Sequence, residues 1–391
     1  MVNKKYAFLT AVLSWMMICT MPLQILAATP EFARSSEEWA KLQDDVLEYD
    51  EIPDLIHEYN ATVKKNAVDM NEYRKDYGDS NDEWSDRYRE LAEEIEDNLD
   101  YPDADDTDYA SRMLTIVSQE MQIDNLRDQA DEQVDDSLIQ YTTYQQAEAA
   151  LVSVAQNNLI SYQKGLAEIE TAKLQYDILQ DTYRTEADRN TVGKATDMDV
   201  LTAEENLKSG QQAVETAEAN TENTRQKLIV MLGWSNQDAP QIEKIPEIDQ
   251  DKLASIDPSE DKKTAIANNY SLKIYQRKME NAVAEDTIEN LRTSIEDGKE
   301  NIGALLTAEY HNVQTANTAY QLALSQSAYA ARQLQIAEHQ YQQSKLSAAE
   351  YTRSQKTAQT AELAVKTCAL NLFQALQDYE WAVNGLASVS Q

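Results

Sequence analysis

The sequence contains few of the residues that make turns. It has 8 glycines and 7 prolines in 391 residues, and its aromatic content is 7% with only 3 phenylalanines. Compact mixed folds need many turns, whereas long helices do not. The composition therefore predicts an all-α, elongated protein with almost no strand.

Basic residues are also scarce. Asp and Glu number 69 against 34 Lys and Arg, so the net charge is −35. Nucleic acids and anionic membranes bind basic patches, which excludes a nucleic-acid partner. The densest acidic run, 90–108, has neither the glycine nor the glutamate that an EF-hand requires. We interpret the charge as the solvated surface of a long rod.

Residue patterns that carry chemistry are absent from the sequence. The three histidines, His57, His311 and His339, are far apart and fit neither metal-ligand nor triad spacing. There is no glycine-rich phosphate loop and no nucleophile elbow. We therefore expect a protein that is not an enzyme and needs no cofactor or metal.

The N-terminus has the pattern of an export signal. Lys4 and Lys5 precede an apolar run, 6–26, and Ala27 and Ala28 provide small residues for cleavage. The alternative is an uncleaved membrane anchor, because the run is nearly long enough to span a bilayer. Cleavage would leave one cysteine, Cys368, so the mature chain is expected to have no intrachain disulfide.

One short turn motif occurs twice, at an offset of 151 positions. Each copy follows a long periodic run and begins with a small residue, a lysine, and then a hydroxyl residue three positions before a carboxylate. The residues are Gly193, Lys194, Thr196 and Asp199, then Ser344, Lys345, Ser347 and Glu350. The hydroxyl and carboxylate have the spacing of a capping box. Each copy therefore predicts a helix, a tight turn and a second helix.

The arms around the two turns carry matching stripes. Small and apolar residues recur at spacings of 3 and 4 from Val200 to Met231, and again from Tyr351 to Ala382. The incoming arms carry similar stripes, which in the second copy include Leu324 and Ala331. This spacing is that of a coiled-coil seam. It predicts two tandem, long antiparallel helical hairpins.

These capped turns and arms resemble the TolC-like outer-membrane efflux proteins over roughly 165–233 and 316–385. The resemblance implies a TolC-like α-barrel subunit that forms a homo-trimer. It also implies that the turns meet a membrane-fusion type adaptor and an inner-membrane or ABC-type transporter. The family inserts transmembrane strands between its helix pairs, but the matching segments 98–109 and 294–305 are acidic or short and polar. The resemblance therefore covers the helical tunnel part only.

The sequence also predicts the division of the chain. The expected parts are a signal peptide (1–28), an acidic helical region (29–104), a first hairpin repeat (105–240), a linker (241–258) and a second hairpin repeat (259–391). Within them, the lack of proline predicts one continuous arm from Asp105 to Arg189. Gly298 and Gly303 predict a turn.

Two functions are consistent with these features. The first is an exported tunnel or scaffold subunit of an efflux or secretion system in the cell envelope, with the eight turn residues as its partner-binding site. The second is a coiled-coil spacer or interaction protein of the envelope that conducts nothing. A closed trimer with a polar lumen would favour the first, and a monomer or open filament would favour the second.

Overall fold

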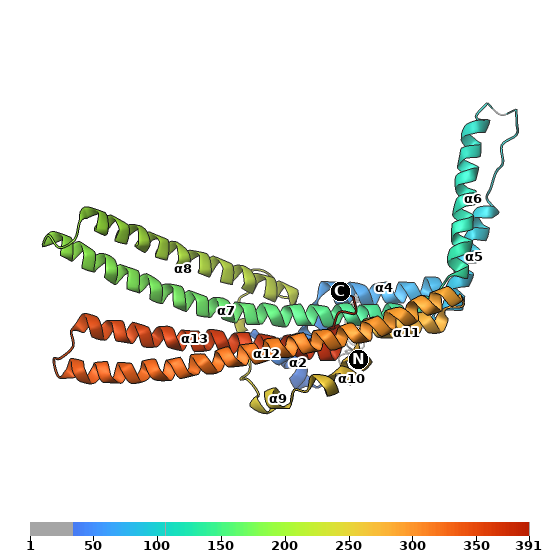
Figure 1. The fold of residues 1–391 in the computed structure, drawn as a ribbon. Helices are drawn as coiled ribbons and strands as arrows, with labels where there is room; N and C mark the ends of the chain where they lie inside the picture. Colours follow the sequence, from blue (N-terminus) through green and yellow to red (C-terminus); the bar gives the residue numbers. More distant parts are fainter. Residues whose placement is uncertain (1–33, 106, 391) are drawn as a thin grey trace, which may run out of the picture.

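The computed structural model describes residues 34–105 and 107–390. The expected signal peptide lies outside the described residues. Two long helical hairpins lie side by side, and both of their turns point to the same end of the molecule (Figure 1). Shorter helices surround the other end, where a third hairpin projects sideways from the body (Figure 1). The predicted all-α, elongated fold is confirmed.

The long hairpins form one layer of four helices. The first hairpin consists of α7 (Ser137–Thr191) and α8 (Asp197–Met231), and the second of α12 (Glu285–Gln342) and α13 (Ala348–Trp381). Because α7 packs against α13, the order across the layer is α8, α7, α13, α12. Helix α13 ends in a short π-helix, η3 (Ala382–Leu386).

Small side chains make the seams of both hairpins. On α8 the buried residues include Ala203, Gly210 and Ala217, all in the predicted stripe. A Cβ atom at Gly210 would lie 2.7 Å from Leu179 Cδ1 on α7, so glycine permits this close approach. On α12 the buried alanines lie one position before the predicted Leu324 and Ala331.

That shift in register has a packing reason. Ala323 and Ala330 are buried on α12, whereas Leu324 is 38% exposed. Alanine at the seam lets α12 approach α13 more closely than leucine would. Leu324 and Ala331 of the predicted incoming stripe were therefore placed one residue too late, whereas Val313 of the same stripe is buried.

At the end away from the turns, a different set of four helices lies side by side. Helices α3 (Ile52–Tyr59) and α4 (Ala61–Tyr77) pack on α7. Helices α10 (Pro258–Asn268) and α11 (Tyr270–Asn281) pack on α12, and α11 also packs on α7. The order here is α4, α7, α11, α12, with α4 and α12 at the two edges. The set α4–α7–α8 thus corresponds to α11–α12–α13.

A strap of N-terminal chain binds the hairpins together. Helix α2 (Ser36–Leu42) leads into β1 (Val46–Leu47), which pairs in parallel with β2 (Gln241–Ile242). The 3-10 helix η2 (Tyr49–Glu51) follows, and α9 (Gln250–Ser255) lies in the predicted linker. The Tyr49 hydroxyl donates to Gln377 Oε1, and Gln377 Nε2 donates to Gln156 Oε1 at 2.7 Å. These bonds connect the strap to α13 and α7.

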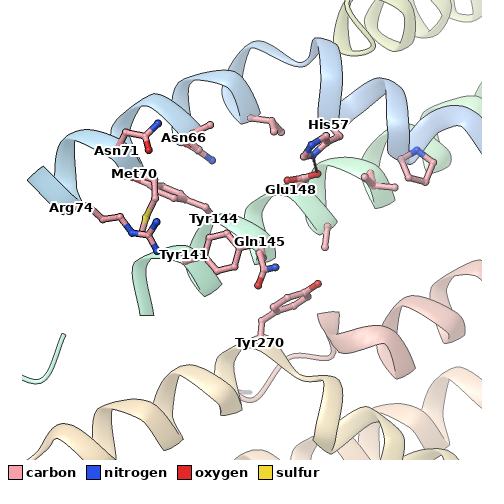
Figure 2. A pocket seen from close by; sticks show the side chains of 15 residues that line it. His57, Asn66, Met70, Asn71, Arg74, Tyr141, Tyr144, Gln145, Glu148 and Tyr270 are labelled. Atoms are coloured by element: carbon pink, nitrogen blue, oxygen red, sulfur yellow. Dashed lines mark hydrogen bonds and ion pairs between the residues drawn. The ribbon is translucent and has the colours of Figure 1, made fainter. Parts of the chain in front are cut away.

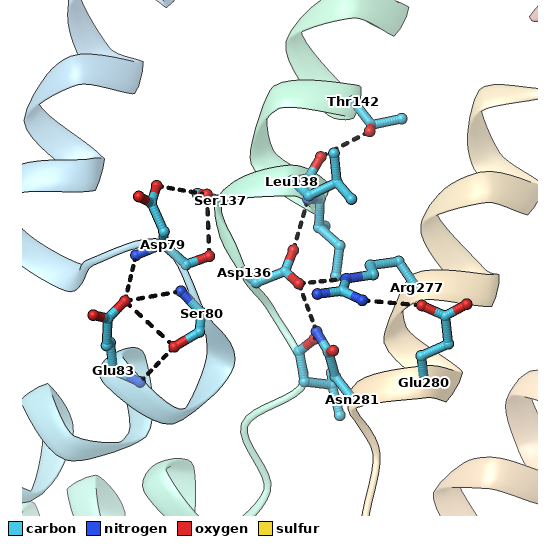
Figure 3. A network of polar contacts seen from close by, with 12 residues as sticks. Asp79, Ser80, Glu83, Asp136, Ser137, Leu138, Thr142, Arg277, Glu280 and Asn281 are labelled. Carbon is cyan, nitrogen blue, oxygen red and sulfur yellow. Dashed lines mark hydrogen bonds and ion pairs between the residues drawn. The ribbon is translucent and has the colours of Figure 1, made fainter.

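The third hairpin consists of α5 (Asn81–Glu96) and α6 (Tyr109–Asp131). Helix α6 packs against α5, and the chain breaks before α7, so the predicted continuous arm from Asp105 to Arg189 is wrong. Figure 3 shows how the break is held. Buried Asp136 accepts from Ile139 N at 2.9 Å, from Arg277 Nε at 2.6 Å and from Asn281 Nδ2 at 2.9 Å. The first helix arm therefore starts at Ser137.

The predicted turn at Gly298 and Gly303 is also wrong, because α12 runs through both residues. A Cβ atom at Gly298 would lie 2.9 Å from Leu272 Cδ2, and one at Gly303 would lie 2.9 Å from Lys262 Cε. The glycines therefore make room for α11 and α10. The chain turns instead at 282–284, between α11 and α12.

Candidate functional site at the hairpin tips

The two predicted turns have the same backbone geometry. Gly193 has φ 70°, and Ser344, at the matching position, has φ 57°. The N–H of Lys194 donates to Arg189 O at 2.8 Å, and the N–H of Lys345 donates to Gln340 O at 2.8 Å. These bonds span five residues and close the incoming helix in the manner of a Schellman motif. The turns thus lie where the sequence placed them.

Both outgoing helices begin with the predicted capping box. Asp199 N donates to Thr196 Oγ1 at 3.2 Å, and Thr196 N donates to Asp199 Oδ2 at 2.8 Å. Glu350 N donates to Ser347 Oγ at 3.3 Å, and Ser347 N donates to Glu350 Oε2 at 3.0 Å. Hydrogen bonds from Thr196 hold the pKa of Asp199 below its ordinary value. Those from Ser347 do the same for the pKa of Glu350.

Capping does not explain why both turns have a lysine at the matching position, Lys194 and Lys345. Lys194 and Lys345 are exposed, and among residues 34–105 and 107–390 neither ammonium group forms an ion pair. Most other cations of this acidic chain have a carboxylate within reach, such as Lys208 with Glu204 at 2.8 Å. The tips therefore each present one unpaired positive charge.

Exposed apolar and aromatic side chains surround these charges. At the first tip, Val192 and Met198 are 66% and 67% exposed. At the second tip, the rings of Tyr341 and Tyr351 stack with centroids 4.9 Å apart. Our sequence reasoning missed these as site residues. The sequence feature that could have identified them is that Val192 and Met198 are apolar but lie outside the periodic stripes of the helix arms.

A groove of 690 Å³ lies between the hairpins close to the tips. It is lined by Arg184 and Arg189 of α7 and by Arg353 and Lys356 of α13. Lys356 Nζ bridges the hairpins through Asp181 Oδ2 at 2.6 Å. This groove could not be predicted, because its walls come from two segments, 178–189 and 348–360, that are distant in sequence.

A second hollow, of 730 Å³, lies at the other end between α4 and α7, with Tyr270 facing it (Figure 2). His57 Nδ1 and Glu148 Oε1 are 2.8 Å apart at one side of it. The hydrogen bond to Glu148 raises the pKa of His57 above its ordinary value. His311 and His339 lie on α12, so the structure does not bring the three histidines together.

The described residues form neither a metal-binding cluster nor a membrane-spanning helix. Within these residues no group of three or more His, Cys, Asp or Glu side chains is arranged to hold a metal ion. In the same part of the chain, no helix combines the length and apolar character needed to cross a bilayer.

The fold is similar to those of two membrane proteins whose structures are solved. A membrane protein from Pseudomonas aeruginosa matches with a TM-score of 0.50 and 11% identity, over 86% of this chain and 93% of that one. The outer-membrane channel OprN matches with a TM-score of 0.53 and 11% identity, over 93% and 97%. By sequence, neither a family profile nor a curated protein matches. The likeness shows that the fold is TolC-like.

Proposed function

We propose that this chain is an exported tunnel subunit of an efflux or secretion system. Three copies would enclose a helical conduit in the cell envelope, and the hairpin tips would meet an adaptor and a transporter. The observation that carries this proposal is the TolC-like layer in which both capped turns lie at one end. The neighbours in structure are channels rather than enzymes, which supports a function without catalysis.

The outer edge of the layer supports assembly with further copies. On α12, Leu322, Tyr329 and Ile336 recur every seven residues and are 58%, 65% and 49% exposed. A stripe with this repeat is a helix-packing seam. Since α12 already buries a different stripe against α13, the second stripe is available to a neighbouring copy. A single layer of four helices cannot cover it.

The tips support docking of a partner. Each tip exposes methionine or aromatic side chains, which are enriched at protein interfaces. The lysine adds a positive charge that can steer an acidic partner surface to the tip. The caps fix the backbone on which these groups sit, so little ordering is needed when a partner binds. We therefore assign Gly193, Thr196, Asp199, Ser344, Ser347 and Glu350 to shaping the tips. Lys194 and Lys345 are assigned to recognition.

The assembly is tested by sedimentation and negative-stain microscopy of the full chain. We expect a trimer with a central lumen at micromolar concentration. A stable monomer would contradict the tunnel proposal. An open filament would instead favour the second function, a coiled-coil spacer of the envelope that conducts nothing.

The docking role is tested by replacing both tip lysines with glutamate. Exposed charges contribute little to stability, so the melting temperature of K194E/K345E should stay within about a degree or two of the parent. Export should fall, measured as retention of a dye in cells that carry the variant as their only copy. The matched control is K75E/K227E, which changes two exposed lysines away from the tips. Equal export by the two variants would leave the tips as caps only.

A further inference from the structure

We propose that the α5–α6 hairpin is a clasp between neighbouring copies of this chain. Its contact surface is the outer stripe of α6, defined as Ala110, Leu114, Val117 and Met121. Its receiving surface is the turn 282–284 and the start of α12 in the next copy. The proposal rests on the ring proposed above and names a contact within it that the tips do not supply.

Helix α6 has two apolar stripes, although a two-helix hairpin needs one. The inner stripe contains Ile116, Ile123 and Ala130, which are buried at 3% exposure each. In the outer stripe, Leu114, Val117 and Met121 are 73%, 44% and 62% exposed. With Ala110, their spacing is 4, 3 and 4 residues, which is that of a coiled-coil seam. The outer stripe thus has the spacing needed to pack against one more helix.

The charge pattern is compatible with another copy as the occupant. On a chain with a net charge of −35, two copies repel each other wherever acidic surfaces face one another. The segment 113–119 contains no charged residue, so it places no acidic group opposite Glu285 and Asp286 at the start of α12. A bilayer with anionic lipids is disfavoured, because Asp100, Asp103 and Asp105 lie at the hairpin's far end.

The position of the hairpin selects its partner surface. It leaves the body on the α4 side and extends past that edge of the layer (Figure 1). Since the order at this end is α4, α7, α11, α12, closing a ring brings the α4 edge of one copy to the α12 edge of the next. Helix α12 begins at Glu285, two residues after Val283, which is 90% exposed. The hairpin of one copy therefore reaches the Val283 turn of its neighbour.

The base of the hairpin fixes its direction. Ser137 Oγ donates to Asp79 O at 3.1 Å, and Arg89 NH2 lies 3.1 Å from Asp131 Oδ1. Arg277 and Asn281 of α11 hold Asp136 at the same place (Figure 3). Asp79, just before α5, and Asp136, between α6 and α7, therefore anchor the two ends of the hairpin to the body, while the Arg89–Asp131 pair holds α5 to α6. These contacts set the direction in which the outer stripe faces.

The contact is tested by a pair of engineered cysteines. The variant V117C/V283C is made in the full chain with Cys19 and Cys368 replaced by alanine, and it is treated with a short bismaleimide. A link within one chain is excluded by distance. Asn281 Nδ2 bonds Val134 O at 2.8 Å, which places the Val283 turn at the hairpin's base. From there, the residues from Val117 to Asp131 span about 21 Å.

We expect covalent dimers and trimers from V117C/V283C and only monomers from V117C or V283C alone. A trimer in sedimentation that gives no covalent ladder would overturn the clasp and leave the ring intact. A monomer in sedimentation would overturn the ring itself. The two failures are therefore distinguishable.

A charge variant gives an independent measurement. Changing Leu114, Val117 and Met121 to glutamate should raise the dissociation constant of the assembly about tenfold or more, because the stripe would lose its apolar area and gain repulsion. The matched control changes Thr115, Gln122 and Gln129, which are exposed on another face of α6, to glutamate. Equal dissociation constants for the two variants would overturn the clasp.

Discussion

Replacing Asp136 with alanine should destabilise the end of the molecule from which the α5–α6 hairpin projects. The carboxylate caps α7 through Ile139 N, and loss of such a cap costs about 0.5–2 kcal/mol. It also pairs with Arg277 and Asn281 while fully buried itself. Arg277 is 37% exposed and keeps Glu280 at 3.0 Å, so it can be resolvated. We therefore expect a total loss of about 2–4 kcal/mol.

The free energy of unfolding is measured by urea titration with far-ultraviolet circular dichroism. Asp136→Asn keeps an oxygen that can cap α7 and should lose about half as much. Glu280→Ala is the control, because an exposed pair of this kind contributes only about 0.5 kcal/mol or less. Hydrogen exchange should show the loss of protection at the start of α7 and the end of α11. A change below about 0.5 kcal/mol for Asp136→Ala would refute this account of the break.

Two further predictions concern a turn and an ion pair. Gly193→Ala should lower the free energy of unfolding by about 1 kcal/mol, because φ is 70°; open space around the site means that no steric clash adds to this loss. Ser344→Gly should be neutral or stabilising by up to about 0.5 kcal/mol, because glycine adopts the positive φ of this position more readily. Thermal unfolding of both variants checks this. The pKa of His57 is raised, so its pair with Glu148 stabilises the fold below about pH 6 and is lost as pH rises through that pKa. Glu148→Gln should therefore lower stability by a few tenths of a kcal/mol at about pH 5.5 and leave it unchanged at pH 9, and equal losses at both would contradict the assignment.

The tips were predictable because their determinants are local. A hydroxyl three residues before a carboxylate defines a capping box whatever surrounds it, and Thr196 and Ser347 both form one. Ser344 shows that the turn does not depend on glycine, because the Lys345 N–H bond to Gln340 O forms with serine at positive φ. The matching offset of the two copies then led to the paired hairpins.

The breaks in the helices were not predictable from the same signals. Residues 132–136 contain neither glycine nor proline, and the break there depends on Arg277 and Asn281, which are 141 and 145 residues away from Asp136. Conversely, Gly298 looked like a turn and instead makes room for Leu272. In both cases a contact distant in sequence decides the local structure.

Two other features also depend on contacts between segments distant in sequence: the groove between the hairpins close to the tips, and the outer stripe of α6. Lys356 and Asp181 face each other only because α13 packs on α7. The outer stripe of α6 lies within the segment that was predicted as part of one continuous arm. Its exposure follows from the pairing of α6 with α5, which leaves this face of α6 uncovered.

The unequal insertions in the two repeats break the symmetry of the chain at one end only. Each copy carries two tips of the same backbone geometry, but it carries the α5–α6 hairpin in the first repeat and a three-residue turn, 282–284, in the second. In a closed ring of n such copies, the tip end would therefore have 2n tips of the same backbone geometry, although the rotational symmetry of the ring is only n-fold. In the proposed ring, a partner with the doubled symmetry would meet a tip of this backbone geometry at each of its positions, whereas the opposite end would offer only the undoubled number of equivalent positions.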